Sequence, residues 1–301
     1  MKKPKAIRQM TLAQLETKFP TDEACREYLM DKRFPSGVRC VRCNNERVHE
    51  AKAKPGSWIC YSCNPKGYRF SVLVGTVFEN TNIPLQTWFK VIHLMLTSKK
   101  GMSALQIHRM IGTGSYETAW YMCHRIRAGL NDRNFRKLMG EVEIDETYVG
   151  GKEKNKHRKD RNNIGGGTGG KIAVVGAVSR KKGRVIAKVI DSVDAMTLSE
   201  FVLDTVSGKV SLIATDESRG YALLKADKWP HKSVNHSRGE YVRGNIHTST
   251  IDGFWSLLKR GIMGSFHKVS AKYLPLYVKE FEFRYNNRRN PDIFGAAIAG
   301  C

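Results

Sequence analysis

Two pairs of cysteines constrain the fold of this chain more than any other feature of its sequence. Each pair has the form Cys-x2-Cys, and sixteen residues separate the pairs: Cys40, Cys43, Cys60 and Cys63. Two such pairs with a linker of this length are typical of a tetrahedral four-thiolate zinc site. Four thiolates complete the coordination shell and leave no position for a reactive water molecule. The spacing predicts a zinc ribbon over residues 37–78 with one structural Zn²⁺; the alternative is four unrelated buried thiols.

The chain is strongly basic. It has 51 Lys and Arg against 28 Asp and Glu, which gives a formal net charge of +23 over 301 residues. Hydrophobic residues make up 41%, so the chain is globular and not a disordered tail. A surface with this charge repels itself unless it binds a polyanion, and each phosphate that it neutralises adds affinity by counterion release. The charge favours a nucleic-acid-binding protein; a ribosomal or merely basic protein is the alternative.

Nothing in the sequence indicates a membrane protein or a secreted one. The basic N-terminus does not lead into the apolar segment of a signal peptide. The longest apolar runs, such as residues 172–178, are far shorter than the ~20 residues that a membrane span needs. The cysteines form Cys-x2-Cys pairs and not a disulfide framework, which indicates an intracellular chain. We expect a cytoplasmic protein that does not bind a membrane.

Helical patterns lie on both sides of the predicted ribbon. Residues 1–36 carry apolar residues at helical spacing and predict a helical segment. Residues 79–139 predict three more helices, and a glycine-containing turn that ends at Ser115, a plausible N-cap, joins the last two. The last helix carries basic residues: His124, Arg125 and Arg127. Two short helices with such a turn are typical of a helix-turn-helix DNA-binding module; a plain three-helix spacer is the alternative.

From residue 140 onward the pattern changes to alternating strands and helices. The order strand, strand, strand, helix, strand, helix predicts an α/β fold of the RNase H kind, a mixed sheet with flanking helices. A glycine-rich loop follows the first strand, and its basic run at 152–161 is a candidate DNA contact. The expected domains are a helical segment (1–36), the ribbon (37–78), a helix-turn-helix-like region (79–139) and the catalytic domain (140–301).

Three aspartates fall where such a domain could hold metal ions. Asp145 lies in the first predicted strand, Asp216 just after the fourth strand, and Asp252, 36 positions later, early in the following helix. Carboxylates that converge from three elements can hold two Mg²⁺ ions, or Mn²⁺. Such an ion pair activates water or a 3′-hydroxyl and stabilises the leaving oxygen in phosphoryl transfer. Taken singly, each aspartate could instead be a surface, turn or capping residue.

The residues around these aspartates resemble the catalytic domain of bacterial insertion-sequence transposases of the DDE type. The resemblance is to the branch that carries an N-terminal zinc ribbon, and it extends over the ribbon of this chain. Its most specific part is the run from His247 to Arg260, HTSTIDGFWSLLKR. Further runs follow in the family's order, at residues 143–151, 215–216, 264–267 and 280–288.

The resemblance implies roles for individual residues. Asp145 and Asp216 are the first two metal ligands, and Asp252 occupies the third acidic position. Lys259, seven positions later, matches the basic residue that follows the third acid, and we expect it to contact a phosphate near the cut. The chain departs from the family in two places, since Ser249 replaces the usual Asn and Asp252 replaces the usual Glu. Ser249 is therefore the second candidate for the third ligand position.

The activity that the resemblance implies is DNA transposition. The protein would cleave insertion-sequence ends by hydrolysis and join the 3′-OH ends to target DNA. Its partners would be double-stranded DNA, both terminal repeats and target, and further copies of itself in a homodimer or higher oligomer. We expect a bacterial, nucleoid-associated protein. The alternatives are a stand-alone RNase-H-like nuclease and a domesticated, non-catalytic zinc-ribbon regulator; the presence of Asp145 and Asp216 argues against the regulator.

Overall fold

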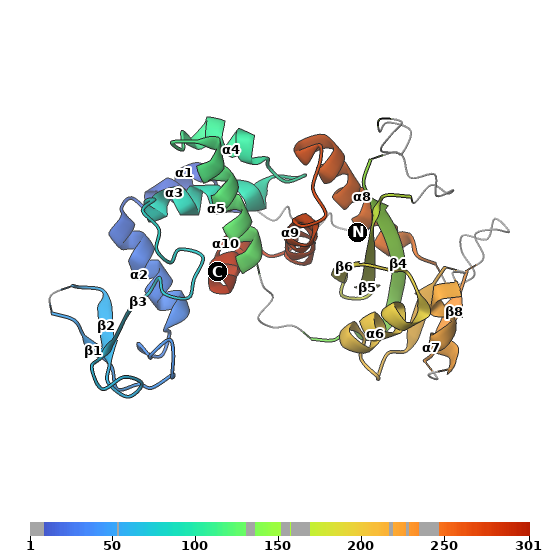
Figure 1. Ribbon diagram of the computed structural model, residues 1–301, viewed down its shortest axis with the longest axis horizontal. Helices are drawn as coiled ribbons and strands as arrows, with labels where there is room; N and C mark the ends of the chain where they lie inside the picture. Colours follow the sequence, from blue (N-terminus) through green and yellow to red (C-terminus); the bar gives the residue numbers. More distant parts are fainter. Residues whose placement is uncertain are drawn as a thin grey trace, which may run out of the picture. The chain divides into compact units, whose positions relative to one another are not determined.

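The computed structural model describes residues 9–52, 54–130, 136–151, 157, 169–216, 219–226, 229–234 and 247–301. These residues belong to two compact units, which we treat separately (Figure 1). Unit 1 comprises Met1–Asn131 and Arg289–Cys301, and unit 2 comprises Asp132–Arg288. Apart from His157, the predicted basic DNA contact at residues 152–161 lies outside the described residues. Within the described part of the chain, no helix is both long and apolar enough to cross a bilayer.

Unit 1 combines a small ribbon with a set of helices. Its helices are α1 (Leu12–Lys18), α2 (Asp22–Arg33), α3 (Leu85–Thr97), α4 (Ala104–Ile111), α5 (Tyr116–Gly129) and α10 (Ile293–Gly300). Its strands are β1 (His49–Glu50), β2 (Ser57–Cys60) and β3 (Tyr68–Ser71), which pair antiparallel in the order β1-β2-β3. The sequence predicted these helices and hairpins, apart from α10.

Helix α3 is the centre of the helical part of unit 1. Its apolar residues cover most of its circumference, and Trp88 and Phe89 are fully buried. The C-terminal helix α10 packs against α2 and α3, with 5.3 Å between the ring centroids of Phe294 and Phe89. We expected the residues up to 301 to belong to the catalytic domain, whereas the chain from Arg289 onward packs into unit 1. Large apolar side chains on α10 account for this association, because they are buried against α3.

Helices α4 and α5 have the spacing expected for a helix-turn-helix. Gly112 ends α4 in the left-handed conformation, with a φ of 71°, and the Oγ atom of Ser115 caps α5 by accepting the N–H of Thr118 at 3.2 Å. The basic residues of α5 are not on its exposed face, however. Arg127 is 1% exposed, and Arg125 donates hydrogen bonds to backbone carbonyls of the segment before α3. Any DNA contact by α5 would therefore use its other side chains.

Unit 2 contains a mixed sheet of five strands in the described part of the chain. The strands are β4 (Glu141–Val149), β5 (Ile172–Ser179), β6 (Arg184–Ile190), β7 (Leu212–Thr215) and β8 (His231–Ser233). Their order is β6-β5-β4-β7-β8; the first three are mutually antiparallel, while β7 is parallel to β4 and to β8. The predicted mixed α/β fold of the RNase H kind is confirmed, and β8 is a strand that the sequence pattern did not reveal.

Helices cover both faces of this sheet. One apolar cluster joins the sheet to α6 (Ala195–Thr205), the 3-10 turn η3 (Arg219–Tyr221) and α7 (Ala222–Ala226). A second cluster joins the other face to α8 (Ser249–Gly261), the π-helical turn η5 (Ile262–Phe266) and α9 (Leu274–Asn286). Strand β4 is buried on both faces because it lies in the middle of the sheet, and alternate side chains of β4 therefore face α6 and α8.

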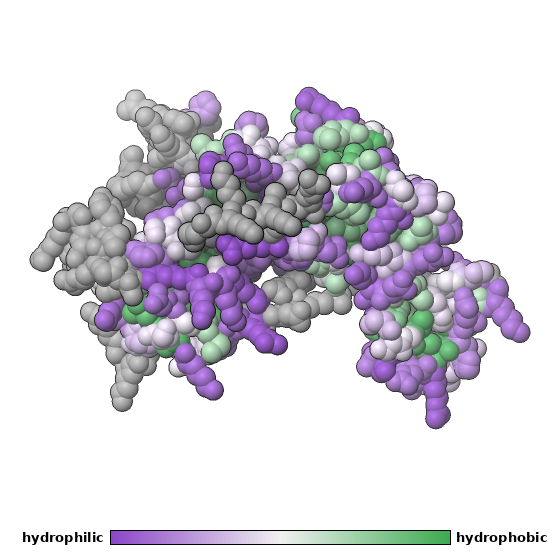
Figure 2. All heavy atoms as spheres, turned by 180° about the vertical axis from the view of Figure 1, so that it is seen from behind, coloured by the Kyte–Doolittle hydropathy of each residue, from purple (hydrophilic) through white to green (hydrophobic). Residues whose placement is uncertain are grey.

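The surface of both units is largely polar. Figure 2 shows that hydrophilic side chains dominate the coloured surface on the face it presents, with smaller hydrophobic areas between them.

Candidate active site and zinc site

The four cysteines of the ribbon meet at one point. Their Sγ atoms all lie within 4.8 Å of one another, with 3.7 Å from Cys40 to Cys63 and 3.7 Å from Cys43 to Cys60. Four sulfurs placed tetrahedrally about 2.3 Å from a zinc ion are about 3.8 Å apart, so these distances fit the ion. Among the described residues, this is the one group of three or more potential ligands gathered so closely. The donor set is that of a structural Zn²⁺.

Asp145 lies in the middle of β4 and faces α8. Its Oδ2 atom accepts a hydrogen bond of 2.9 Å from Nε1 of Trp255, a residue of α8. The partner of Asp145 on β5 is Gly176. A Cβ atom at Gly176 would lie 2.6 Å from the Trp255 ring, so the absence of a side chain there makes room for the indole. A glycine and a tryptophan from two different elements thus fix the orientation of the Asp145 carboxylate.

Two of the predicted aspartates, Asp216 and Asp252, lie near Asp145. Asp216 follows β7 directly, and the parallel register of β4 and β7 brings it level with Asp145. Asp252 lies in the first turn of α8. Burial raises the pKa of Asp145 to about 7, and the negative charges of Glu146, Asp216 and Asp252 also raise it. Asp216 and Asp252 are far from Asp145 in the sequence, and their effect on its pKa reflects their proximity to it in the fold.

The aspartates are close without meeting at a single point. Among the described residues, the aspartates do not form a close group of ligand atoms like that of the four cysteines. Asp216 is half-buried and Asp252 is exposed, so neither is forced against Asp145 by packing. Repulsion between like charges keeps such groups apart when no cation lies between them. The arrangement is an acidic site formed by β4, the end of β7 and the first turn of α8.

The other predicted site residues lie along α8 or just before it. Lys259 is exposed, and because it follows Asp252 by seven positions it lies on the same side of the helix, about 10 Å along its axis. Ser249 is the exposed first residue of α8, and its Oγ atom lies 2.9 Å from Nδ1 of His247. The pKa of Asp145 responds to Asp252, whereas the contact that Ser249 makes is with His247.

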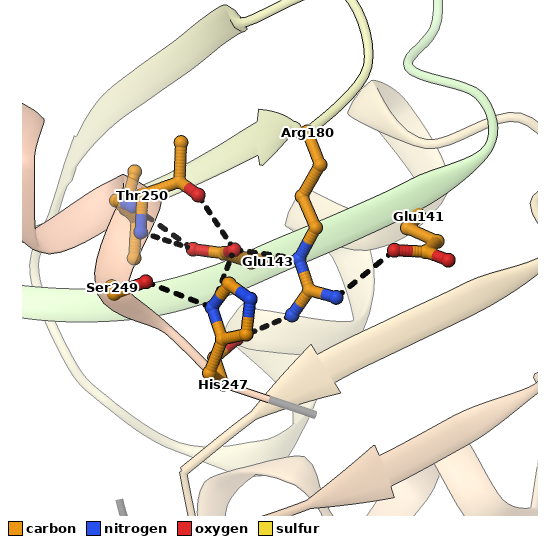
Figure 3. Close-up of polar contacts among 7 residues, drawn as sticks. Glu141, Glu143, Arg180, His247, Ser249 and Thr250 are labelled. Carbon is orange, nitrogen blue, oxygen red and sulfur yellow. Dashed lines mark hydrogen bonds and ion pairs between the residues drawn. The ribbon is translucent and has the colours of Figure 1, made fainter. Parts of the chain in front are cut away.

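Glu143, two residues before Asp145, was not among the predicted site residues. Its side chain is fully buried and accepts hydrogen bonds from the first turn of α8 and from Arg180 (Figure 3). Its Oε1 atom also lies 3.2 Å from Nδ1 of His247. A sequence signal for this role exists: Glu143 and Asp145 are both acidic at alternate positions of a strand whose neighbours Val142 and Ile144 are apolar. A buried acid there needs partners from elsewhere.

On the opposite face of β4, a second glutamate, Glu146, binds Tyr221, which follows Asp216 in the sequence. Oε2 of Glu146 accepts a hydrogen bond of 2.5 Å from the hydroxyl of Tyr221, which is 2% exposed. Burial raises the pKa of Glu146 to about 7, the hydrogen bond from Tyr221 lowers it, and the charge of Asp216 raises it. Nearby, Thr215 Oγ1 lies 2.7 Å from Nε2 of His231 on β8. These contacts hold Thr215, directly before Asp216, and Tyr221, five residues after it.

Comparison with known proteins agrees with this architecture. Residues 137–286 match a family model described as an ISXO2-like transposase domain, and residues 20–66 match a transposase zinc-ribbon domain. An uncharacterised protein in the transposable element ISH50 of Halobacterium salinarum is 29% identical over 285 residues, which cover 91% of this chain and 94% of the relative. An uncharacterised transposase-like protein of Haemophilus influenzae is 29% identical over 106 residues, 35% of this chain and 84% of the relative.

A search of solved structures found a chain in a cryoEM structure of the simian T-cell lymphotropic virus intasome in complex with PP2A regulatory subunit B56 gamma. The alignment covers 59% of this chain and 63% of that chain, with 14% sequence identity and a TM-score of 0.29.

A zinc ribbon that precedes a domain of the RNase H kind with an acidic site on β4 defines a DNA-processing enzyme of the transposase class. The chain belongs to the family with the ISXO2-like transposase domain.

Proposed function

We propose that Asp145, Asp216 and Asp252 bind two Mg²⁺ ions and that unit 2 thereby cleaves insertion-sequence ends and joins the 3′-OH ends to target DNA. The observation that carries this proposal is the proximity of three acids from separate elements: Asp145 on β4, Asp216 directly after β7 and Asp252 in the first turn of α8. Bound there, the ions would activate the attacking oxygen and stabilise the leaving oxygen of an in-line displacement.

We propose two ions in preference to one because cleavage and joining each require that both the attacking and the leaving oxygen be stabilised. Two ions about 3.5–4 Å apart require one carboxylate near both of them and further ligands on either side. Asp145, Asp216 and Asp252 would supply the carboxylate ligands of these ions.

The neighbours of these aspartates support specific tasks. The N–H of Trp255 restricts the rotation of the Asp145 carboxylate, which favours ions that demand near-ideal octahedral geometry. Exposed Lys259, on the same side of α8 as Asp252, is suited to bind a phosphate of the DNA strand.

We favour Asp252 over Ser249 as the third ligand because Asp252 carries a carboxylate in the first turn of α8, whose N–H groups Glu143 of β4 accepts. Asp is one methylene shorter than Glu, so either α8 lies close to β4 or a water molecule bridges Asp252 to the ion. Asp252→Ala should reduce cleavage strongly, with partial rescue by Mn²⁺. Severe loss in Ser249→Ala together with normal cleavage by Asp252→Ala would assign the position to Ser249.

The proposed partners are a zinc ion, double-stranded DNA and further copies of this chain. The four cysteines would hold Zn²⁺ and stabilise the ribbon, and the basic surface would bind the terminal repeats and the target as double-stranded DNA. Two ends must react together, so we propose a homodimer or a higher oligomer on the DNA, acting at the nucleoid in the cytoplasm.

The test is an end-processing assay with zinc-loaded protein and a DNA fragment that carries both ends of its element. With Mg²⁺ we expect strand cleavage at the ends, joining of pre-cut 3′-OH ends to a plasmid, and neither product without Mg²⁺ or with Asp145→Asn. Cleavage without joining would identify a stand-alone nuclease. DNA binding without metal-dependent cleavage would identify a non-catalytic regulator.

A further inference from the structure

The first turn of α8 is capped by a residue from a distant strand. The N-terminal N–H groups of a helix have no acceptors within the helix. The residue that precedes α8, Thr248, gives no side-chain cap. Instead, Oε2 of Glu143 on β4 accepts the N–H groups of Thr250 at 2.8 Å and Ile251 at 3.0 Å, across more than a hundred residues of sequence. Oε1 of Glu143 also accepts the hydroxyl of Thr250 at 2.8 Å.

An arginine balances the charge of this buried cap. Nε of Arg180 lies 2.6 Å from Oε1 of Glu143, and the two other nitrogens of the guanidinium reach Oε2 of Glu141 at 3.0 Å and the carbonyl oxygen of His247 at 2.7 Å. Figure 3 shows Glu143 between the helix end and the guanidinium. The side chain of Glu143 is 0% exposed and that of Arg180 is 13% exposed, so little water competes for these contacts.

The carboxylate of Glu143 accepts too many hydrogen bonds to serve as a metal ligand itself. A carboxylate has about four lone-pair positions. Donors from the described residues already reach them: Nε of Arg180, both the N–H and the hydroxyl of Thr250, and the N–H of Ile251. Any effect of Glu143 on a metal ion must therefore act through the elements that it joins.

The two elements that Glu143 joins, β4 and α8, carry the proposed ligands Asp145 and Asp252. Glu143 precedes Asp145 by two residues on the same face of β4, and Asp252 follows the capped residue Ile251 directly. One turn further along α8, Trp255 donates to Asp145. Helix α8 is thus fastened to β4 at two points, on either side of Asp252. Loss of the cap frees the turn that carries Asp252 while the second point holds.

We propose that Glu143 is a positioning residue that sets the separation of the Asp145 and Asp252 carboxylates and so the affinity of the site for divalent metal. This inference rests on the proposed function, in which both aspartates are ligands. A cap with only a structural role would affect the stability of unit 2 and leave metal affinity unchanged.

The test compares Glu143→Gln with Glu141→Gln in zinc-loaded, full-length protein. Glutamine keeps the shape of Glu143, but its amide nitrogen cannot accept a hydrogen bond. Glu141→Gln, on the same strand and beside the same arginine, is the matched control, because Glu141 does not touch α8 in the described contacts. Free Mn²⁺ is measured by electron paramagnetic resonance during titration, and folding by circular dichroism and Tm.

We expect the Mn²⁺ dissociation constant of Glu143→Gln to rise at least roughly tenfold, the size of effect that partners of metal ligands have, and that of Glu141→Gln to stay within about twofold. The Mg²⁺ concentration that half-saturates cleavage should rise in parallel. Thr250→Val removes the hydroxyl that donates to Glu143 without a change of shape. This variant should weaken Mn²⁺ binding by a smaller factor. It serves as the test if Glu143→Gln does not fold.

Folded variants at Glu143 and Thr250 with the wild-type Mn²⁺ affinity would overturn the inference and leave the proposed function standing. Wild-type protein that binds no Mn²⁺ outside the cysteine site would instead overturn the proposed function, and the inference with it.

Discussion

Replacing Asp145 with Asn should stabilise the protein when Mg²⁺ is absent and zinc is retained, although the change removes a proposed ligand. The pKa of Asp145 is raised by burial to about 7 in the folded protein, against about 3.9 in an unfolded chain. Between these values the folded state binds more protons than the unfolded state. The free energy of unfolding therefore falls as the pH rises from about 4 to about 7, and the loss is complete above pH 7.

The size of this effect follows from the shift. A difference of about three pKa units at about 1.4 kcal/mol each corresponds to about 4 kcal/mol at pH 8 and about 2 kcal/mol at pH 5.5. Asn keeps the size of Asp and an oxygen that can accept the N–H of Trp255, so little packing or hydrogen bonding is lost. The Asn variant should therefore exceed the wild type in the Tm of unit 2 by up to about 10 °C at pH 8.

The assay is thermal and urea unfolding in chelator-free buffers at pH 5.5 and pH 8, with and without Mg²⁺. Asp204→Asn, at an exposed position of α6, is the control and should change stability by less than about 0.5 kcal/mol at both pH values. Mg²⁺ should stabilise the wild type and have little effect on Asp145→Asn. An Asp145→Asn protein that is less stable than the wild type at pH 8, or a gain that does not grow with pH, would refute the reasoning.

Three further predictions follow from the zinc site, from Gly176 on β5 and from the net charge of +23. Cys60→Ser should lose about one equivalent of zinc by elemental analysis and unfold the ribbon while unit 2 keeps its circular dichroism; a zinc-free but fully folded ribbon would contradict this. Gly176→Ala should displace Trp255, cost roughly 1–3 kcal/mol and reduce cleavage, whereas Gly253→Ala, with open space around its Cβ position, should not destabilise. DNA affinity should fall by orders of magnitude between about 50 and 200 mM salt, and a flat response would contradict electrostatic binding.

Much of the fold could be predicted because its main elements have strong local patterns. The alternation in residues 141–149 predicted β4 with the bounds that the structure has, and the Cys-x2-Cys pairs predicted the ribbon. Strand β8 is only three residues long, His231–Ser233, and its polar sequence has no alternation, so only its pairing with β7 identifies it. The association of α10 with unit 1 depends on long-range packing, which no local pattern encodes.

The sequence pointed to the acids of the candidate site but not to the contacts that support them. The spacing of Asp145, Asp216 and Asp252 indicated a metal site because carboxylates from three different elements can converge to hold metal ions. The cap that Glu143 provides depends on a contact between residues more than a hundred positions apart. Likewise, the inward direction of Arg125 on α5 depends on the carbonyls that it meets, so charge alone suggested an exposed basic helix.

The central claim is that three aspartates hold two catalytic ions, and the most direct measurement is anomalous X-ray scattering from crystals soaked in Mn²⁺. We predict two manganese peaks roughly 3.5–4 Å apart, within coordination distance of Asp145, Asp216 and Asp252, with zinc at the four cysteines. Crystals saturated with Mn²⁺ that show no peak beside Asp145, or whose manganese ions lie away from Asp216 and Asp252, would contradict the account.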